Sequence, residues 1–239
     1  MHIDCARLHP DRSPTDERYP FTLEVLRPPT ILGLAQPVTM FVGENGSGKS
    51  TLLRALARRC GIHMWRPQVG RRSAPNPYED LLDRFISVRW TDRRVPGSFF
   101  DGETFNHFAL VLEDWAVDDP GQLKYFGGHS LLTLSHGQSL MSFFRARYAV
   151  RGIYFLDEPE TALSPSSLLE LLRLLVEMAR AGHAQFIIAT HSPILLACPG
   201  ATIYSFDSAP ITPIAYEDTV HYRVYREFMA DPQRWVAQL

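Results

Sequence analysis

Short apolar runs alternate with amphipathic segments along this chain of 239 residues. Three of the runs, residues 37–42, 152–157 and 185–190, are apolar at nearly every position. Strands of that kind are buried on both faces, as in a parallel sheet covered by helices. Residues 52–57 and 165–181 follow two of these runs and are expected to be helical. The pattern therefore predicts an α/β fold with a mostly parallel sheet flanked by helices.

The remaining segments carry weaker patterns. We expect strands at 21–26 and 85–90, helices at 103–115, 138–150, 221–229 and 232–238, and a hairpin formed by 201–206 and 211–215. Residues 1–18 are polar and irregular, which favours a poorly ordered lead-in. Residues 66–78 are rich in Arg, Pro and Gly, which favours an exposed loop.

A glycine-rich stretch, Gly-Glu-Asn-Gly-Ser-Gly-Lys-Ser-Thr at 43–51, separates the first apolar run from its helix. It fits the pattern G-x-x-x-x-G-K-[ST] of a phosphate-binding P-loop, and the alternative is a glycine-rich turn before an ordinary helix. Backbone N–H groups and the start of the helix suit phosphate oxygens. Lys49 is expected to reach the β- and γ-phosphates, and Ser50 to bind Mg²⁺. The residues expected to bind ATP here are Gly43, Asn45, Gly46, Ser47, Gly48, Lys49, Ser50 and Thr51.

Three polar residues follow the other apolar runs. Asp157 is expected to hold Mg²⁺ opposite Ser50, and Glu158 to orient and polarise an attacking water as general base. His191 follows the run at 185–190 and is expected to donate a hydrogen bond to the γ-phosphate. The predicted catalytic residues are thus Lys49, Glu158 and His191. The alternatives are carboxylates that cap a helix and a histidine with a structural role.

Composition narrows the class of protein. Hydrophobic residues make up 45% of the chain and the formal net charge is −2. This is an ordinary globular composition, and the charge argues against general attraction to nucleic acid or anionic membranes. The three cysteines lack metal-site spacing, and no apolar run is long enough for a membrane span. We expect a cytoplasmic protein with no integral membrane segment.

Four motifs occur in the order and spacing of one known superfamily. They are the P-loop, Leu-Ser-His-Gly-Gln at 134–138, Asp-Glu-Pro-Glu-Thr-Ala-Leu-Ser-Pro at 157–165, and Thr-His-Ser-Pro at 190–193. The chain resembles the ATP-binding-cassette (ABC) ATPases, and within them the soluble branch related to SMC, RecF and overcoming-lysogenisation-defect proteins and to small bacterial "AAA family" ATPases. The resemblance covers about residues 37–206.

The resemblance implies a head-to-tail homodimer that encloses ATP. Ser135 and Gly137 of one copy would contact the γ-phosphate held by the P-loop of the other, and Gln138 completes this signature motif. It also implies one ATPase domain, with a nucleotide-binding core at about 20–60 and 150–215, an inserted signature-bearing lobe at about 61–149, and a helical tail at 216–239.

The sequence departs from the family pattern in several places. His136 replaces the first glycine of the signature, and Ser164 replaces an aspartate found in transporter subunits. No glutamine occupies the usual Q-loop position, for which Glu103 and Asn106 are candidate replacements. Tyr19 or Phe21 are candidates to stack on adenine, although a place in the core is the stronger interpretation. Arginines at 54, 58, 59, 66, 71, 72, 145, 147 and 151 form either a solvated surface or a rim that binds DNA.

These observations favour an ATP hydrolase that closes and opens a dimer, with a DNA or protein partner that responds to the change. Its cofactors would be ATP and Mg²⁺. One alternative is the nucleotide-binding subunit of a membrane ABC transporter, which the missing Q-loop glutamine and the Glu160 and Ser164 positions count against. The other is a nucleotide-sensing regulatory module, which the intact set of catalytic residues counts against.

Overall fold

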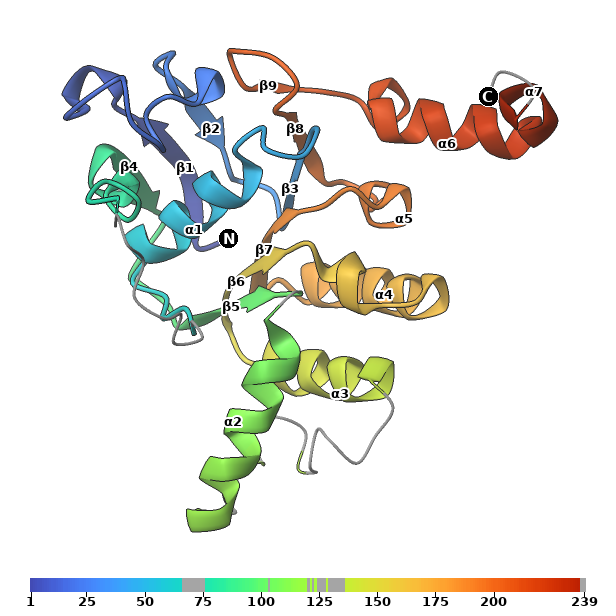
Figure 1. Ribbon diagram of the computed structural model, residues 1–239. Coiled ribbons are helices and arrows are strands. Elements are labelled where there is room, and N and C mark those ends of the chain that lie inside the picture. The colour runs from blue at the N-terminus through green and yellow to red at the C-terminus, as the bar shows by residue number, and fades with distance from the viewer. Residues whose placement is uncertain are drawn as a thin grey trace.

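A six-stranded sheet runs through the middle of the computed structural model (Figure 1), which describes residues 1–65, 76–102, 104–119, 121, 123, 128 and 136–236. The strand order is β5-β6-β7-β3-β8-β9, with the first five strands parallel and β9 antiparallel to β8. The bounds are β5 Gly97–Asp101, β6 Gly152–Asp157, β7 Ala184–Ala189, β3 Val38–Val42, β8 Thr202–Ser205 and β9 Thr212–Pro213. The predicted α/β fold with a mostly parallel sheet is confirmed.

A second, antiparallel sheet covers one side of the first. Its order is β2-β1-β4, formed by Ile31–Gly33, Ile3–Leu8 and Ile86–Trp90. Helix α1 (Lys49–Arg59) contacts β4 of this sheet and β6 and β7 of the large sheet. The helix therefore packs between the two sheets (Figure 1).

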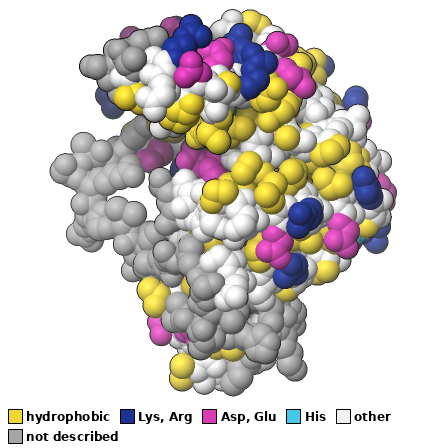
Figure 2. Space-filling view, turned by 90° about the vertical axis from the view of Figure 1, so that its right-hand side faces the viewer, with side chains coloured by type: hydrophobic (Ala, Val, Ile, Leu, Met, Phe, Trp, Pro, Cys, Tyr) yellow, Lys and Arg dark blue, Asp and Glu magenta, His cyan; other side chains and the backbone are white. Residues whose placement is uncertain are grey.

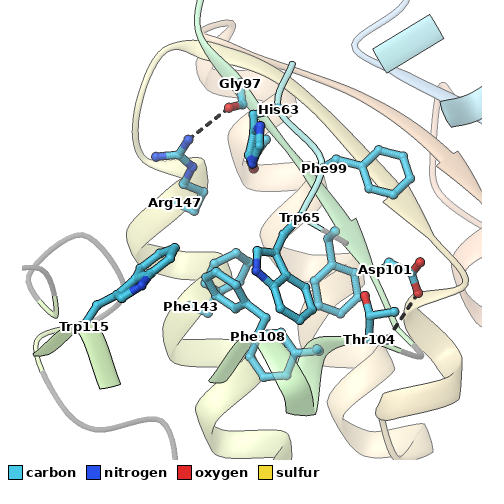
Figure 3. Close-up of a pocket in the computed structure, with 13 residues that line it drawn as sticks. His63, Trp65, Gly97, Phe99, Asp101, Thr104, Phe108, Trp115, Phe143 and Arg147 are labelled. Atoms are coloured by element: carbon cyan, nitrogen blue, oxygen red, sulfur yellow. Dashed lines mark hydrogen bonds between the residues drawn. The ribbon is translucent and has the colours of Figure 1, made fainter. Parts of the chain in front are cut away.

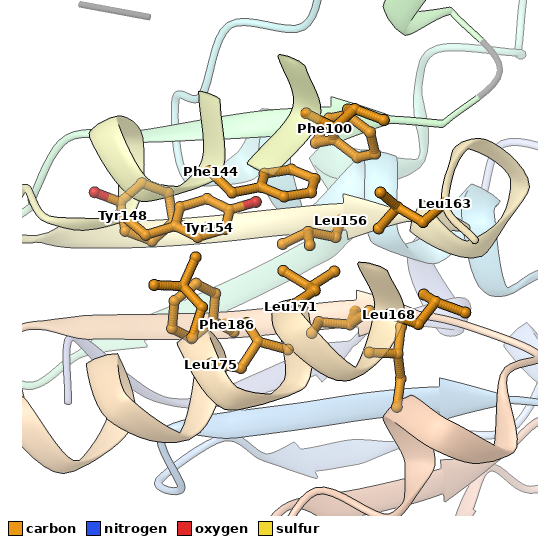
Figure 4. Close-up of a cluster of buried hydrophobic side chains, with 14 of the residues drawn as sticks. Phe100, Phe144, Tyr148, Tyr154, Leu156, Leu163, Leu168, Leu171, Leu175 and Phe186 are labelled. Atoms are coloured by element: carbon orange, nitrogen blue, oxygen red, sulfur yellow. The ribbon is translucent and has the colours of Figure 1, made fainter. Parts of the chain in front are cut away.

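The other side of the large sheet carries three helices, α3 (His136–Tyr148), α4 (Pro165–Ala181) and α5 (Pro193–Leu196). The apolar faces of α3 and α4 meet β6 and β7 in the cluster shown in Figure 4, and Leu195 and Leu196 of α5 belong to the same core. Helix α4 has clear end signals, because the Ser164 side chain accepts a hydrogen bond from the Ser167 N–H and Gly182 ends the helix in a left-handed conformation.

The two remaining regions lie at the periphery. Helix α2 (Phe105–Asp118) extends away from the end of β5, and α6 (Val220–Ala230) with α7 (Pro232–Val236) forms an arm that projects from the body (Figure 1). The arm carries exposed apolar side chains, among them Tyr225, Phe228 and Met229. Among the described residues, no helix combines the length and apolar character needed to span a membrane.

The apolar runs follow from burial on both faces of the large sheet. In β6, Ile153 and Phe155 belong to the core beneath the second sheet, whereas Tyr154 and Leu156 belong to the core beneath α3 and α4. All six residues of β6 are buried, and the same holds for all six of β7. Most side chains on both faces are therefore apolar, with Asp157 and Gln185 as buried polar exceptions, and this made the strands recognisable in the sequence.

Two predictions were wrong. Residues 1–18 are not a poorly ordered lead-in, because β1 pairs with both β2 and β4 and the side chains of Ile3 and Ala6 are fully buried. Residues 21–26 do not form a strand. Glu24–Leu26 is one turn of 3-10 helix, which buries the adjacent pair Val25 and Leu26 on one side, as alternation in a strand would not. Strands β2 and β5 were not predicted.

The other predicted elements are present. Strand β4 and helices α1 to α4, α6 and α7 overlap the expected segments, and β8 and β9 form the expected hairpin. Most of the expected loop at 66–78 lies outside the described residues, as do the last residues of the tail.

Candidate functional site

Polar residues gather where the parallel strands of the large sheet end. Gly43 follows β3, Asp101 ends β5, Asp157 ends β6, His191 follows β7 by two residues, and Asp207 follows β8 by two. Neighbouring parallel strands bring their carboxyl ends to the same edge, and open α/β sheets bind ligands there. The edge is therefore the candidate functional site.

The loop between β3 and α1 approaches this edge with its backbone. Gly48 has a φ of 102° at the cap of α1, and an added Cβ would lie 3.1 Å from the side chain of Leu23, so glycine is required there. The N–H of Glu44 donates to Oδ1 of Asp207 at 3.0 Å, which ties the loop to the end of β8. Asn45 and Gly46 are exposed at the loop tip, and Ser47 is half-buried.

Lys49 begins α1 and is only 3% exposed. Its ammonium group donates to the carbonyl oxygens of Gly43 at 2.7 Å and Glu44 at 2.9 Å. Burial lowers the pKa of Lys49, and the nearby carboxylates of Glu158 and Asp157 oppose that shift. The lysine is thus held over the loop as a cation, where it can exchange carbonyl oxygens for phosphate oxygens.

Asp157 is 3% exposed and sits beside a guanidinium group. Nη2 of Arg54 lies 3.0 Å from Oδ2 of Asp157 and 3.1 Å from Oδ2 of Asp101. Burial raises the pKa of Asp157 to about 6, although Arg54 and a hydrogen bond from Ser50 lower it. The Ser50 hydroxyl and the Asp157 carboxylate are therefore neighbours. Hydroxyl and carboxylate oxygens are ligands that suit Mg²⁺, so this pair fits the ion.

Glu158 has a φ of 46°, the one positive value found for a residue other than glycine in the described part of the chain. Such a conformation costs on the order of 1–3 kcal/mol and collects at functional sites. The turn is held by Thr161, whose hydroxyl and N–H both donate to the Glu158 carbonyl, at 2.8 and 3.1 Å. Gly102 packs against the same carbonyl, since an added Cβ would lie 2.4 Å from it.

His191 lies between two other side chains. Its Nε2 is 3.3 Å from Oε1 of Glu158, and its Nδ1 is 3.0 Å from Nε2 of His221 at the start of α6. Oε1 of Glu160 accepts hydrogen bonds from the His191 N–H and, at 2.9 Å, from the Thr190 hydroxyl. Burial lowers the pKa of His191, as does the charge of Lys49. The lowered pKa favours a neutral imidazole for His191 at the sheet edge.

The signature motif is described only from its third residue. Ser135 lies outside the described residues, and His136 begins α3. Gly137 is half-buried in the first turn, where an added Cβ would lie 3.1 Å from Oγ of Ser167, and Gln138 is exposed. Figure 1 places α3 far from the P-loop of the same chain.

The candidates for adenine stacking and for the Q-loop position lie in different environments. Phe21 is a core residue, 6% exposed and packed edge-to-face against Phe85 with ring centroids 5.3 Å apart, so it offers no free face to adenine. Tyr19 is 44% exposed and its hydroxyl hydrogen-bonds the Thr51 hydroxyl at 2.7 Å. Glu103 lies outside the described residues, and Asn106 lies in α2.

Several of the arginines are paired with acids. Arg54 contacts Asp157, Arg58 contacts Asp80 at 2.7 Å, and Arg145 contacts Glu170. On the face shown in Figure 2, Lys and Arg side chains lie among Asp and Glu side chains and form no single basic patch. Arg66, Arg71 and Arg72 lie outside the described residues.

A cavity of about 260 Å³ lies beside the site, on the outer side of β5 (Figure 3). Aromatic side chains line it, and Arg147 closes one end by donating to the Gly97 carbonyl at 2.9 Å. Asp101 contributes to this cavity and also contacts Arg54, so it connects the cavity to the sheet edge.

Four residues of the site had not been predicted as such: Arg54, Asp101, Asp207 and His221. A strand at 97–101 would have placed Asp101 at the edge, but its sequence, Gly-Ser-Phe-Phe-Asp, is too short and mixed to be recognised. His221 reaches the site from the far end of the chain, and no local pattern marks it.

Comparisons with known proteins show which families the chain is similar to. Residues 130–197 match the family described as "AAA domain, putative AbiEii toxin, Type IV TA system". The manganese transport system ATP-binding protein MntA of Synechocystis is 27% identical over 170 residues, which are 64% of this chain and 64% of that protein. The chain thus spans a little under two thirds of that relative's length.

Solved structures share the fold. CbiO1 of Clostridium perfringens, part of the ABC transporter complex CbiONQ, superimposes with a TM-score of 0.55 at 17% identity and covers 99% of this chain and 100% of its own. An SMC head domain bound to the C-terminal winged-helix domain of ScpA gives 0.53 at 13% identity, with 90% and 98% covered.

A P-loop at the carboxyl edge of a mostly parallel sheet defines the class as a P-loop α/β nucleotide-binding fold. The sequence matches show that the chain is similar to ABC-type ATP-binding proteins, and the predicted resemblance to that superfamily is confirmed.

Proposed function

We propose that the protein is an ATPase that binds Mg-ATP at the carboxyl edge of the large sheet and uses its hydrolysis to drive a conformational switch. One observation carries the proposal, which is that Lys49, Asp157, Glu158 and His191 meet at this edge although they come from three separate strand ends. Phosphoryl transfer to water uses a cation on the phosphates, an acid that holds Mg²⁺ and a base that accepts a proton from the water, and a neutral imidazole can donate to the γ-phosphate.

Each group has a distinct role in the proposed reaction. Lys49 leaves its carbonyl partners and binds the β- and γ-phosphates. Ser50 and Asp157 would hold Mg²⁺, which when bound neutralises charge on the phosphates. Glu158 accepts a proton from the attacking water, and the His191 Nε2–H donates to the γ-phosphate. For Asp157 to bind Mg²⁺, Arg54 must give up its contact with Asp157, and it can keep its contact with Asp101.

The second half of the proposal concerns assembly. In Figure 1 the start of α3, which follows the signature Ser135, lies apart from the P-loop, so contact of the signature with a γ-phosphate requires a second copy of the chain. We therefore propose a head-to-tail homodimer that closes around ATP through Ser135, Gly137 and Gln138. A protein or DNA partner would respond to closure.

A second candidate function is the ATP-binding subunit of a membrane transporter. The similarity to MntA and to CbiO1 favours it, because both of those proteins belong to transport systems. The aromatic cavity beside β5 would then be a place for the membrane subunit to contact. Co-purification with a membrane protein encoded nearby would support this candidate over a free-standing ATPase.

Two variants test the proposed activity. Lys49→Ala should abolish binding of ATP, because the phosphate charge is no longer offset. Glu158→Gln should bind ATP as the unaltered protein does but release no phosphate, because the proton acceptor is gone. Binding is measured by calorimetry and phosphate release by a coupled assay. Full turnover in Glu158→Gln would remove Glu158 from its proposed role.

A further inference from the structure

The C-terminal arm contributes a side chain to the site. His221 lies in the first turn of α6, with its Nε2 3.0 Å from Nδ1 of His191 and the two ring centroids 5.0 Å apart. Its place is fixed by the helix cap, since the fully buried Thr219 accepts a hydrogen bond from the Tyr222 N–H and donates one to the Tyr216 carbonyl at 2.7 Å. The contact is therefore part of how α6 begins.

Only one arrangement of protons suits this pair of rings. Nε2 of His191 faces the Glu158 carboxylate at 3.3 Å, and a carboxylate accepts hydrogen bonds but cannot donate them. A lone pair on Nε2 of His191 would face this negative charge, so the proton belongs on Nε2, which leaves Nδ1 as the acceptor. The proton between the rings must come from Nε2 of His221.

The far side of His221 imposes no other arrangement. Its Nδ1 is buried and has no hydrogen-bond partner in the described part of the chain. Whether it carries a proton or a lone pair, this nitrogen is a buried polar group without a partner, so it does not decide between the two forms. The contact with Nδ1 of His191 decides, and it places the proton of His221 on Nε2.

Burial, together with the charge of Lys49, favours the neutral form of both rings. Burial lowers the pKa of His221, and Lys49 adds to this, whereas Glu44 and Asp207 oppose it. Burial and Lys49 likewise lower the pKa of His191 against the effect of Glu158. Of these two neutral imidazoles, His221 donates to His191, and Nε2 of His191 faces the Glu158 carboxylate at 3.3 Å without a hydrogen bond to it in the described part of the chain.

We infer that His221 is a positioning residue, which fixes His191 in the Nε2-protonated form that the γ-phosphate and Glu158 both need. The inference rests on the proposed function for its catalytic consequence. It also gives the arm a role, because any movement of the start of α6 would release the ring of His191.

The test uses two variants of the full chain. His221→Phe keeps a ring in place but cannot donate, whereas His221→Gln keeps an N–H that can reach Nδ1 of His191. Tyr225→Ala, an exposed position on the same helix, is the matched control. Nitrogen NMR of histidine-labelled protein reports which nitrogen of His191 is protonated, with the signal assigned by its loss in His191→Gln.

We expect His191 to be Nε2-protonated in the unaltered protein, in His221→Gln and in Tyr225→Ala, and to become a mixture of both forms in His221→Phe. The same His221→Phe variant should lose about tenfold in kcat, as loss of a positioning hydrogen bond does elsewhere, with ATP affinity unchanged. The glutamine variant should recover most of that loss.

Three results are decisive. Unchanged protonation of His191 in His221→Phe would overturn the inference. Altered protonation with unchanged kcat would overturn its catalytic consequence and leave His221 a packing residue. If no form of the protein hydrolyses ATP while the NMR signals still change as expected, the proposed function fails and the positioning of His191 by His221 stands.

Discussion

Asp157 is the residue of the site whose charged form is least stabilised by its surroundings. Its carboxyl group is buried, and Arg54 and Ser50 offset only part of the cost of burying the charge. A bound cation would supply the missing compensation. Without a ligand, the contribution of Asp157 to the free energy of unfolding should therefore be least favourable at pH values at which its carboxyl group is charged.

The first prediction concerns the pH dependence of that cost. The Asp157 carboxyl keeps its proton up to about pH 6 in the folded protein but loses it near 3.8, its ordinary value, in the unfolded chain. Folding therefore takes up a proton in between, and the free energy of unfolding falls as the pH rises from about 4 to 6. The loss from this group is about 3 kcal/mol at 1.36 kcal/mol per pKa unit.

The Asp157→Asn variant should lack that decrease. Urea unfolding without nucleotide or metal, at pH 4.5 and at pH 7, measures the difference in stability between the variant and the unaltered protein. We expect this difference to move in favour of the variant at the higher pH. A difference that is the same at both pH values would show that Asp157 does not titrate in this range.

The second prediction concerns Glu160, which holds the end of β7 from the loop after β6. Glu160→Ala leaves the Thr190 hydroxyl and the His191 N–H without their acceptor, at a cost of about 2 kcal/mol or more. Glu160→Gln retains an acceptor oxygen and is the matched control, with a smaller loss. Thermal unfolding compares the two, and equal losses would contradict this account of Glu160.

Sequence motifs predicted the residues at strand ends but not their partners. Lys49, Asp157, Glu158 and His191 stand in spacings that the P-loop chemistry demands, so they could be named from the sequence. Whether Arg54 or Arg59 of the same helix faces the acid depends on how α1 packs between two sheets. The sequence around α1 does not contain this information, because the packing involves strands that are distant in the chain. For that reason the sequence grouped Arg54 with the other arginines of a solvated surface or DNA-binding rim.

At the scale of elements, two turns at the sheet edge depend on each other. The loop after β5 and the loop after β6 touch at Gly102, where an added Cβ would lie 2.2 Å from the Thr161 hydroxyl and 2.4 Å from the Glu158 carbonyl. Because one of these atoms belongs to the backbone, the contact cannot be relieved by a side-chain rotation. The conformation of Glu158 therefore depends on a glycine in the neighbouring loop.

The third prediction follows from this contact. Gly102→Ala should lower the free energy of unfolding by about 1–3 kcal/mol through overpacking, and reduce ATP turnover by displacing Glu158. Gly33→Ala is the matched control, because its added Cβ would meet only the Tyr204 hydroxyl at 3.4 Å. Chemical unfolding and phosphate release measure both effects. Gly102→Ala with normal stability and turnover would contradict the proposed coupling of the loops.

Elements were predictable from the sequence where burial or end signals were strong. Strands β3, β6 and β7 are buried on both faces, and α4 has Pro165 at its start and Gly182 at its end. Strand β1 was missed because polar residues such as Asp4 and Arg7 interrupt its apolar positions. Its identity as a strand comes from pairing with residues 86–90, far away in the chain.

At the scale of the whole molecule, the arrangement of the motifs matters more than any single one. The proposed catalytic residues lie at one sheet edge, helix α3 after the signature motif lies elsewhere in the same chain, and the arm of α6 and α7 projects from the body (Figure 1). A second copy, placed head to tail, would bring each signature to the other copy's P-loop. The active form would then be the dimer.

The fourth prediction is a change of mass. Glu158→Gln with Mg-ATP should double from 27.1 kDa in light scattering, because bound ATP that is not hydrolysed keeps the two copies together. Ser135→Arg added to Glu158→Gln should prevent the change, because it places bulk and charge against the partner's nucleotide. Binding of ATP without any change of mass would contradict a shared site.

The most direct test of the account is the rate of phosphate release per chain, measured over a range of protein concentrations. A site completed by a second copy predicts that this rate rises with concentration and levels off once the dimer is saturated, with Glu158→Gln at background throughout. A rate per chain that is independent of concentration in a protein whose mass stays at 27.1 kDa, or no release at any concentration, would contradict it.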